Sequence, residues 1–120
     1  MKSTIHPGSF KNAFEGLTHF IRTESNGRIQ FIFSVFIILL SFFLNITKIE
    51  WVVVLICIGV VLCAEILNSA LESLCDYIQP LYNPHIKIIK DLAAGAVLVI
   101  CVLSSIIGVI IFVPKILKLL

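Results

Sequence analysis

Three long apolar runs restrict this chain to folds that place helices inside a membrane. They cover residues 29–46, 51–64 and 92–113, and only short polar segments separate them. A helix needs about 20 mostly apolar residues to cross a hydrocarbon core of about 30 Å. With 59% hydrophobic and 13% charged residues, the composition also departs from that of soluble domains. We therefore predict an all-α integral membrane protein. The small net charge of +2 argues against a nucleic-acid partner.

The segment before the first apolar run predicts a helix that lies on the membrane surface. Residues 1–9 are polar and are expected to form a flexible arm. In residues 10–22, large apolar side chains recur on one face of a helix, while charged and amide side chains occupy the other faces. Such a helix is too polar to span a bilayer and is typical of an amphipathic helix at an interface.

The apolar runs and their polar continuations predict the membrane spans. Three transmembrane helices are expected at residues 29–46, 51–78 and 91–113, all within one domain over residues 1–120. Gln79 and Pro80 end the second helix, because proline cannot continue the helical hydrogen-bond ladder. The third helix is expected to end before Pro114, which leaves a short basic tail.

The basic residues predict an orientation. Six of them precede the first span or fill the second loop, and three lie in the first loop or the tail: Lys2, Lys11, Arg22, Arg28, Lys87 and Lys90 against Lys48, Lys115 and Lys118. Cytoplasmic loops carry an excess of Lys and Arg. The N-terminus and the second loop are therefore expected on the cytoplasmic side.

A polar stripe interrupts the second span, and it is the strongest functional signal in the chain. Glu65, Asn68, Glu72 and Asp76 follow one another at i, i+3, i+7 and i+11, so a helix presents them on one face. Carboxylates next to hydrocarbon are costly unless they have partners. Carboxylates about one turn apart also repel one another unless a cation lies among them. Mg²⁺ suits such oxygen ligands, because one or two carboxylates with water and phosphates can hold it.

The stripe fits several kinds of chemistry. It could be a polar seam between helices, a cation path in a small transporter, or a site for transferring a charged group to a lipid. Phosphoryl transfer needs a metal, a cation on the phosphates and a base near the accepting hydroxyl. Glu65 is the deepest acid and the best placed to meet a lipid hydroxyl, and Lys90 and Asp91 follow in the second loop. No Gly-rich phosphate loop is present in the sequence.

The run AEILNSALESLCD, followed by KDLAAGAV, closely resembles the small prokaryotic diacylglycerol kinase and undecaprenol kinase family. The likeness extends from about Phe10 to the C-terminus, with Glu24 at a matching distance before the first span. The resemblance implies a homotrimer in the bacterial inner membrane, with active sites that neighbouring subunits share on the cytoplasmic side. It also implies transfer of the ATP γ-phosphate to a lipid alcohol with Mg²⁺ as cofactor.

The same resemblance implies roles for individual residues. Glu65 would accept the proton of the lipid substrate's hydroxyl, and Asn68 would help to position the reacting groups. Glu24 and Glu72 would hold the metal and the nucleotide. The other nucleotide contacts would come from Asp76, Tyr82, Lys90 and Asp91.

The chain departs from the family pattern at two places that bear on the acceptor. Residues 81–83 keep only the Tyr of the Glu-Tyr-His found in some diacylglycerol kinases, and Ala94 stands where those often have Ser. The AAGA run and the IIGVIIFVPK ending are more similar to the Gram-positive undecaprenol kinases. The acceptor stays open between diacylglycerol and undecaprenol, and so do nucleotide contacts from Asn12 and residues 81–83.

Overall fold

The computed structural model describes residues 7–120, which form helices joined by short connections. The helices are α1 (Pro7–Thr23), α2 (Ser25–Phe43), α3 (Lys48–Ile78) and α4 (Pro84–Leu119). No strand occurs within residues 7–120, and α2, α3 and α4 are each long and apolar enough to cross a membrane. The predicted fold class, an all-α membrane protein with a short first helix and three spans, is confirmed.

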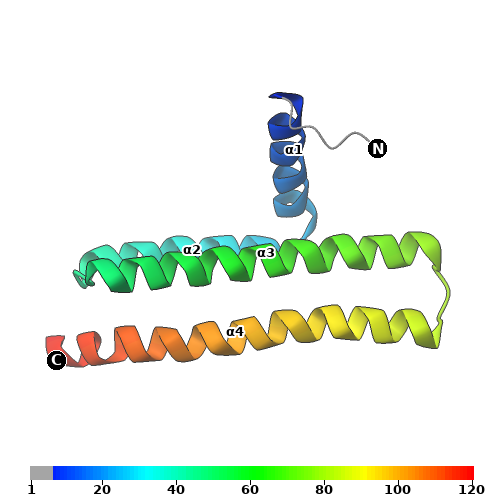
Figure 1. Cartoon of the computed structure of the whole chain (residues 1–120). Helices are drawn as coiled ribbons and strands as arrows, with labels where there is room; N and C mark the ends of the chain where they lie inside the picture. The colour runs from blue at the N-terminus through cyan, green and yellow to red at the C-terminus, as the bar shows by residue number, and fades with distance from the viewer. Residues whose placement is uncertain (1–6) are drawn as a thin grey trace.

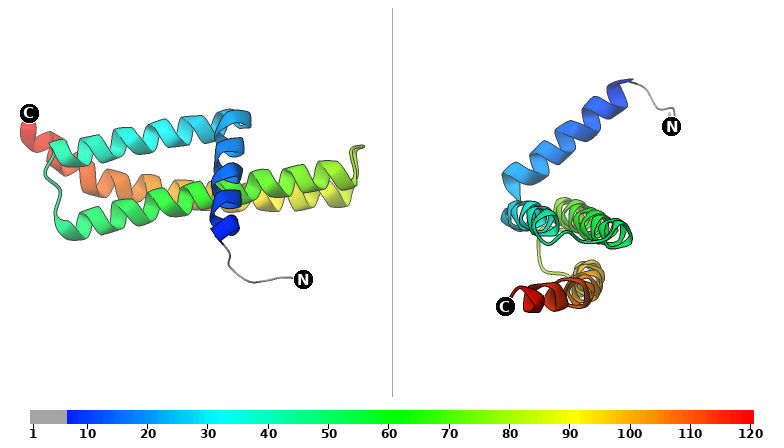
Figure 2. Two further views of the ribbon diagram at one scale, coloured as in Figure 1. Left: turned by 90° about the horizontal axis from the view of Figure 1, so that it is seen from above. Right: turned by 90° about the vertical axis from the view of Figure 1, so that its left-hand side faces the viewer.

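The three long helices run side by side, and α1 leaves the start of α2 at a steep angle and points away from the bundle (Figure 1). The connection between α2 and α3 lies at one end of the bundle, and α1 joins α2 nearer the other (Figure 2). We call these the far end and the α1 end. The crosswise direction of α1, with Phe10 and Phe14 exposed, is what a helix lying on a membrane surface requires.

The helices differ in length in a way that shapes the α1 end. At 1.5 Å per residue, the 19 residues of α2 extend about 28 Å, which matches a hydrocarbon core of about 30 Å. The 31 residues of α3 and 36 residues of α4 extend about 46 Å and about 54 Å. Because α2 ends and α3 begins at the far end, the excess length of α3 and α4 projects past α1 as a helical hairpin (Figure 1).

The far end holds the buried core of the bundle. Ile46, Val54, Ile111 and Phe112 form one apolar cluster there. The rings of Phe42 and Trp51 pack edge to face with centroids 4.7 Å apart. This packing joins the α2–α3 turn to the last third of α4.

Local capping explains where α3 begins. The N–H of Glu50 donates to Thr47 Oγ1 (3.2 Å), and the N–H of Thr47 donates to Glu50 Oε1 (2.8 Å). This reciprocal capping box starts the helix at Lys48, three residues before the predicted start at Trp51. The predicted end of α3 at Ile78, before Gln79, is observed.

The predicted start of the third span at residue 91 is wrong, because α4 begins at Pro84. Asn83 caps this helix: its Oδ1 accepts hydrogen bonds from the N–H groups of His85 (2.9 Å) and Ile86 (3.3 Å). Proline is favoured at the first helical position, where its missing N–H has no helical acceptor to lose. The Asn83-Pro84 pair is therefore the start of the helix.

The predicted end before Pro114 is also wrong, since α4 continues through Pro114 to Leu119. A proline inside a helix removes one hydrogen bond, which membrane helices tolerate. Here tertiary structure favours continuation, because Lys115 Nζ reaches Glu50 Oε1 at 3.1 Å. The ion pair ties α4 to the capping box of α3 at the far end.

The first half of the chain shows smaller differences. The predicted arm over residues 1–9 lies partly outside the described residues, and residues 7–9 belong to α1, which runs to Thr23 and not only over 10–22. The span predicted at 29–46 is the helix Ser25–Phe43. It ends there because Asn45 adopts a positive φ of 52°, which asparagine tolerates, and turns Ile46 into the core.

Candidate active site

The predicted polar stripe exists as one face of α3. Glu65, Asn68 and Glu72 are each half-buried, whereas Asp76 is exposed on the projecting hairpin. Asn68 Nδ2 donates to Glu72 Oε1 at 3.2 Å, so the amide orients that carboxylate. Asn68 Oδ1 is buried and has no hydrogen-bond partner within residues 7–120. A buried acceptor without a partner is costly, which marks this point of the stripe as incomplete without a ligand.

Glu24 comes from a different part of the chain and joins the stripe. It lies in the connection between α1 and α2 in an extended conformation (φ −106°, ψ 113°) and is half-buried. The carboxylate of Glu65 interacts electrostatically with those of Glu72 and Glu24. Glu65 is therefore within electrostatic range of two other carboxylates, and like charges near one another favour a bound cation.

A tight elbow between α1 and α2 holds Glu24 in this place. The backbone of Gly27 packs against the ring of buried Phe20, where an added Cβ would lie only 2.6 Å from a ring carbon. The guanidinium of Arg28 donates to the carbonyls of Ile21 (3.0 Å) and Arg22 (2.8 Å), which are among the last of α1. These contacts set the angle at which α1 leaves α2.

Sequence reasoning missed the roles of Gly27 and Arg28 in the elbow. The signal that could have found them is the Asn26-Gly27-Arg28 sequence directly after Glu24. A glycine between two helices commonly marks a close approach of backbone and side chain. An arginine near a helix C-terminus can donate to the carbonyls that lack partners there.

The basic and acidic residues of α4 separate into two positions. Lys90 Nζ donates to Asp76 Oδ1 across the hairpin, and it interacts electrostatically with Glu72. Asp91 instead forms an ion pair with Lys87, one helical turn away, with 2.6 Å between Lys87 Nζ and Asp91 Oδ2. Both side chains are largely exposed. The structure therefore brings Lys90 to the stripe but does not bring Asp91 to it.

Tyr82, another predicted nucleotide contact, lies in the connection between α3 and α4 and is largely exposed. Asn12 is exposed on α1. Their proposed contacts with a nucleotide stay predictions.

The donor set fits a magnesium ion shared with a substrate. Within residues 7–120, no three His, Cys, Asp or Glu side chains are arranged to hold a metal ion by themselves. The carboxylates of Glu24 and Glu72 and the free oxygen of Asn68 are hard oxygen donors. Mg²⁺ is commonly held by one or two carboxylates, with water and substrate phosphates completing its shell. The residues present can therefore supply the protein part of such a site.

Comparisons with known proteins find related lipid kinases. The family model described as prokaryotic diacylglycerol kinase matches residues 11–112. The chain is 37% identical over 107 residues to an undecaprenol kinase of Bacillus subtilis, and the alignment covers 89% of this chain and 87% of that protein. It is 34% identical over 112 residues to a diacylglycerol kinase of Synechocystis sp., covering 92% of this chain and 64% of that longer protein.

Proposed function

Because the chain belongs to the prokaryotic diacylglycerol kinase family, we propose that it is a lipid kinase that transfers the γ-phosphate of ATP to a membrane lipid alcohol. We propose undecaprenol as its preferred acceptor and diacylglycerol as the alternative. The undecaprenol kinase relative supports this order, since it has the higher identity and matches the chain over most of both lengths.

One observation carries the proposal: the carboxylate of Glu65 on α3 lies within electrostatic range of Glu72 and of Glu24, which comes from the connection between α1 and α2. A lipid hydroxyl lies at the membrane boundary, and a nucleotide can reach it from the aqueous side. The projecting hairpin adds Lys90 on that same side. Phosphoryl transfer requires carboxylates that hold a metal, a cation that contacts the phosphates and a base near the accepting hydroxyl.

The residues take distinct roles in this proposal. Glu65, the most deeply placed acid, accepts the proton of the lipid hydroxyl as the oxygen attacks the γ-phosphorus. Asn68 holds Glu72 in place through its amide, and Glu24 and Glu72 would hold Mg²⁺. When bound, Mg²⁺ would neutralise charge on the transferred phosphoryl group and the leaving ADP. Lys90 leaves Asp76 to contact the phosphates, and Asp76, Tyr82 and Asp91 contact the nucleotide.

The location follows from the same arrangement. We propose that the protein lies in the bacterial inner membrane with its N-terminus and site in the cytoplasm, where ATP is available and where the basic residues favour it. The many apolar side chains exposed on α2, α3 and α4 would face lipid or neighbouring subunits of a homotrimer.

A cation transporter is the alternative from another class. A conduction path needs ionisable or polar groups through the membrane. Residues 29–46, 51–64 and 92–113 contain no charged residue, and the acids of the polar stripe follow the apolar run of α3 toward the α1 end. The arrangement favours an enzyme at a membrane boundary.

The experiment that tests the proposal measures transfer of radiolabelled phosphate from ATP by the purified protein in mixed micelles. Undecaprenol and diacylglycerol are given side by side, with Mg²⁺ and with EDTA. We expect Mg²⁺-dependent labelling, with the higher kcat/KM for undecaprenol. Labelling of diacylglycerol alone would reverse the acceptor assignment. Folded protein that labels neither lipid would contradict the kinase proposal.

A further inference from the structure

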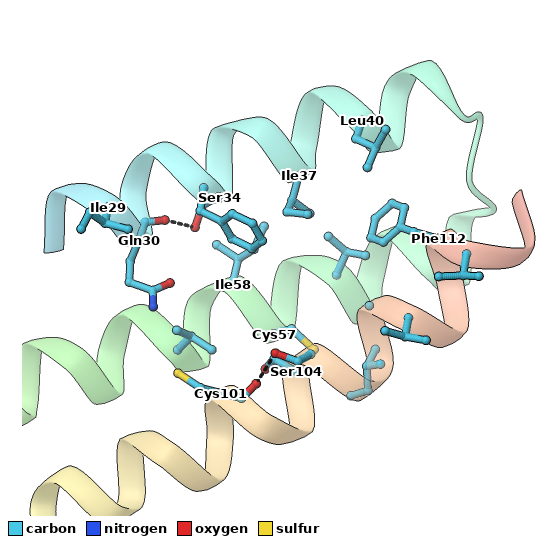
Figure 3. A pocket seen from close by; sticks show the side chains of 18 residues that line it. Ile29, Gln30, Ser34, Ile37, Leu40, Cys57, Ile58, Cys101, Ser104 and Phe112 are labelled. Carbon is cyan, nitrogen blue, oxygen red and sulfur yellow. Dashed lines mark hydrogen bonds between the residues drawn. The ribbon is translucent and has the colours of Figure 1, made fainter. Parts of the chain in front are cut away.

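A half-open pocket of about 580 Å³ lies between α2, α3 and α4 (Figure 3). Its volume falls within the roughly 300–1,000 Å³ that ligand sites occupy. Apolar side chains from all three helices line it, and none of its lining residues in the described chain carries a charge. The mechanism proposed above does not use this pocket.

The pocket runs along the bundle from the α1 end toward the far end. Figure 3 shows Gln30 and Cys101 toward one end and Leu40 and Phe112 toward the other. Cys101 interacts electrostatically with Glu65. The lining residue Val61 also lies one helical turn before Glu65 on α3, so the end of the pocket at the α1 side adjoins the carboxylate assigned as the base.

Gly108 keeps the far part of this pocket open. It is one of the lining residues, and a Cβ built on it would meet no atom within 4 Å apart from its own helix. Gly108 lies seven positions after Cys101 on α4, which is about 10 Å along the helix axis. A larger side chain at Gly108 would enter the pocket without disturbing the helix packing around it.

We propose that this pocket binds the hydrocarbon chain of the acceptor lipid, and that Gly108 determines how much of the chain the pocket holds. The proposal rests on the lipid kinase function proposed above. With its hydroxyl at Glu65, an acceptor lipid extends its chain along the membrane normal, which is also the direction of the helices and of the pocket. An uncharged, half-open pocket binds such a chain through apolar contact and lets the remainder continue into the bilayer.

The test compares Gly108→Leu with Gly59→Leu in the full-length protein. Gly59 is the matched control, because it is exposed on α3, does not line the pocket, and also has open space at its Cβ. We expect Gly108→Leu to raise the KM for undecaprenol by about tenfold or more, which is the usual discrimination for added methylenes in an apolar pocket. The KM for ATP should stay unchanged, and Gly59→Leu should match the wild type.

Chain length supplies a second readout. Geraniol would occupy only the part of the pocket near Glu65, so Gly108→Leu should phosphorylate it as well as the wild type does. Gly108→Ala should raise the undecaprenol KM by less than Gly108→Leu, which keeps the test valid if the leucine variant does not fold.

Three results would overturn the assignment: an unchanged undecaprenol KM, an equal loss on geraniol and undecaprenol, or a changed oligomer size in detergent with unchanged KM values. The last result would assign the pocket to a contact with a second copy. Failure of the wild type to phosphorylate any lipid alcohol would instead contradict the proposed function, so the two failures are distinguishable.

Discussion

At the scale of single residues, the site depends on three carboxylates whose charges are not balanced within the stripe. Glu65 interacts with both Glu72 and Glu24, and the basic group at the stripe, Lys90, is hydrogen-bonded to Asp76. The free Oδ1 of Asn68 adds an unused acceptor in this region. Such an arrangement is stable only at some cost, and a bound cation with a phosphate group relieves it. The residues that are least favourable for folding are therefore those that the proposed reaction needs.

Glu65→Gln tests the assignment of the base. The amide keeps the shape of the side chain but cannot accept the hydroxyl proton, so kcat should fall by about a hundredfold or more. Nucleotide binding, measured with a fluorescent ATP analogue, should stay close to that of the wild type. Glu15→Gln on the exposed surface of α1 is the control and should have no effect on either quantity. Near-normal turnover by Glu65→Gln would exclude Glu65 as the base.

At the scale of elements, the elbow between α1 and α2 decides whether Glu24 reaches the stripe. Phe20 is 6% exposed and packs against the backbone of Gly27, and Arg28 closes the end of α1 from the other side of the connection. A helix pair of this kind has little freedom to change its angle, because a closely packed ring must move first. The elbow thus places one ligand of the proposed metal site.

Gly27→Ala tests this positioning. A methyl group 2.6 Å from the Phe20 ring must displace the ring or the helix, and either movement shifts Glu24 relative to Glu65. We expect a higher Mg²⁺ concentration for half-maximal activity, because Glu24 is a proposed metal ligand, with little change in the KM for the lipid. Gly16→Ala on α1 is the matched control, because a Cβ there meets no neighbour. If Gly27→Ala and the wild type need the same Mg²⁺ concentration, the elbow does not position a ligand of the metal.

At the scale of the whole molecule, the two ends of the bundle have different tasks. The far end is closed by the apolar cluster and by the Lys115–Glu50 ion pair (3.1 Å). The α1 end has its acids, its projecting hairpin and the start of the lateral pocket. Tight packing at one end gives the helices a fixed register, which allows polar groups at the other end to remain incompletely satisfied.

Substitutions at the far end should therefore change stability and leave catalysis intact. Glu50→Ala removes the capping box and the ion pair together, whereas Lys115→Met removes the ion pair alone. We expect the melting temperature in detergent to fall for both variants, and further for Glu50→Ala. The KM values for ATP and lipid, measured well below the melting temperature, should match those of the wild type. Altered KM values in Lys115→Met would show that the two ends are coupled.

The sequence by itself determined the helices and the polar stripe, because both follow from local regularities. The lengths of the apolar runs predicted three spans. Helical spacing predicted that Glu65, Asn68 and Glu72 share a face, and Pro80 predicted the end of α3. The same local reasoning placed both ends of α4 incorrectly, at residues 91 and 113. The helix begins at Pro84, which occupies its first position, and it continues through Pro114.

Only the tertiary structure decided which residues meet across helices. It brought Glu24 within electrostatic range of Glu65, paired Lys90 with Asp76 and Asp91 with Lys87, and formed a half-open pocket between three helices. These contacts depend on the angle of the elbow at Gly27 and on the register of α4 against α3. Both are set by side chains packing between segments far apart in the chain, which helical periodicity within one segment does not specify.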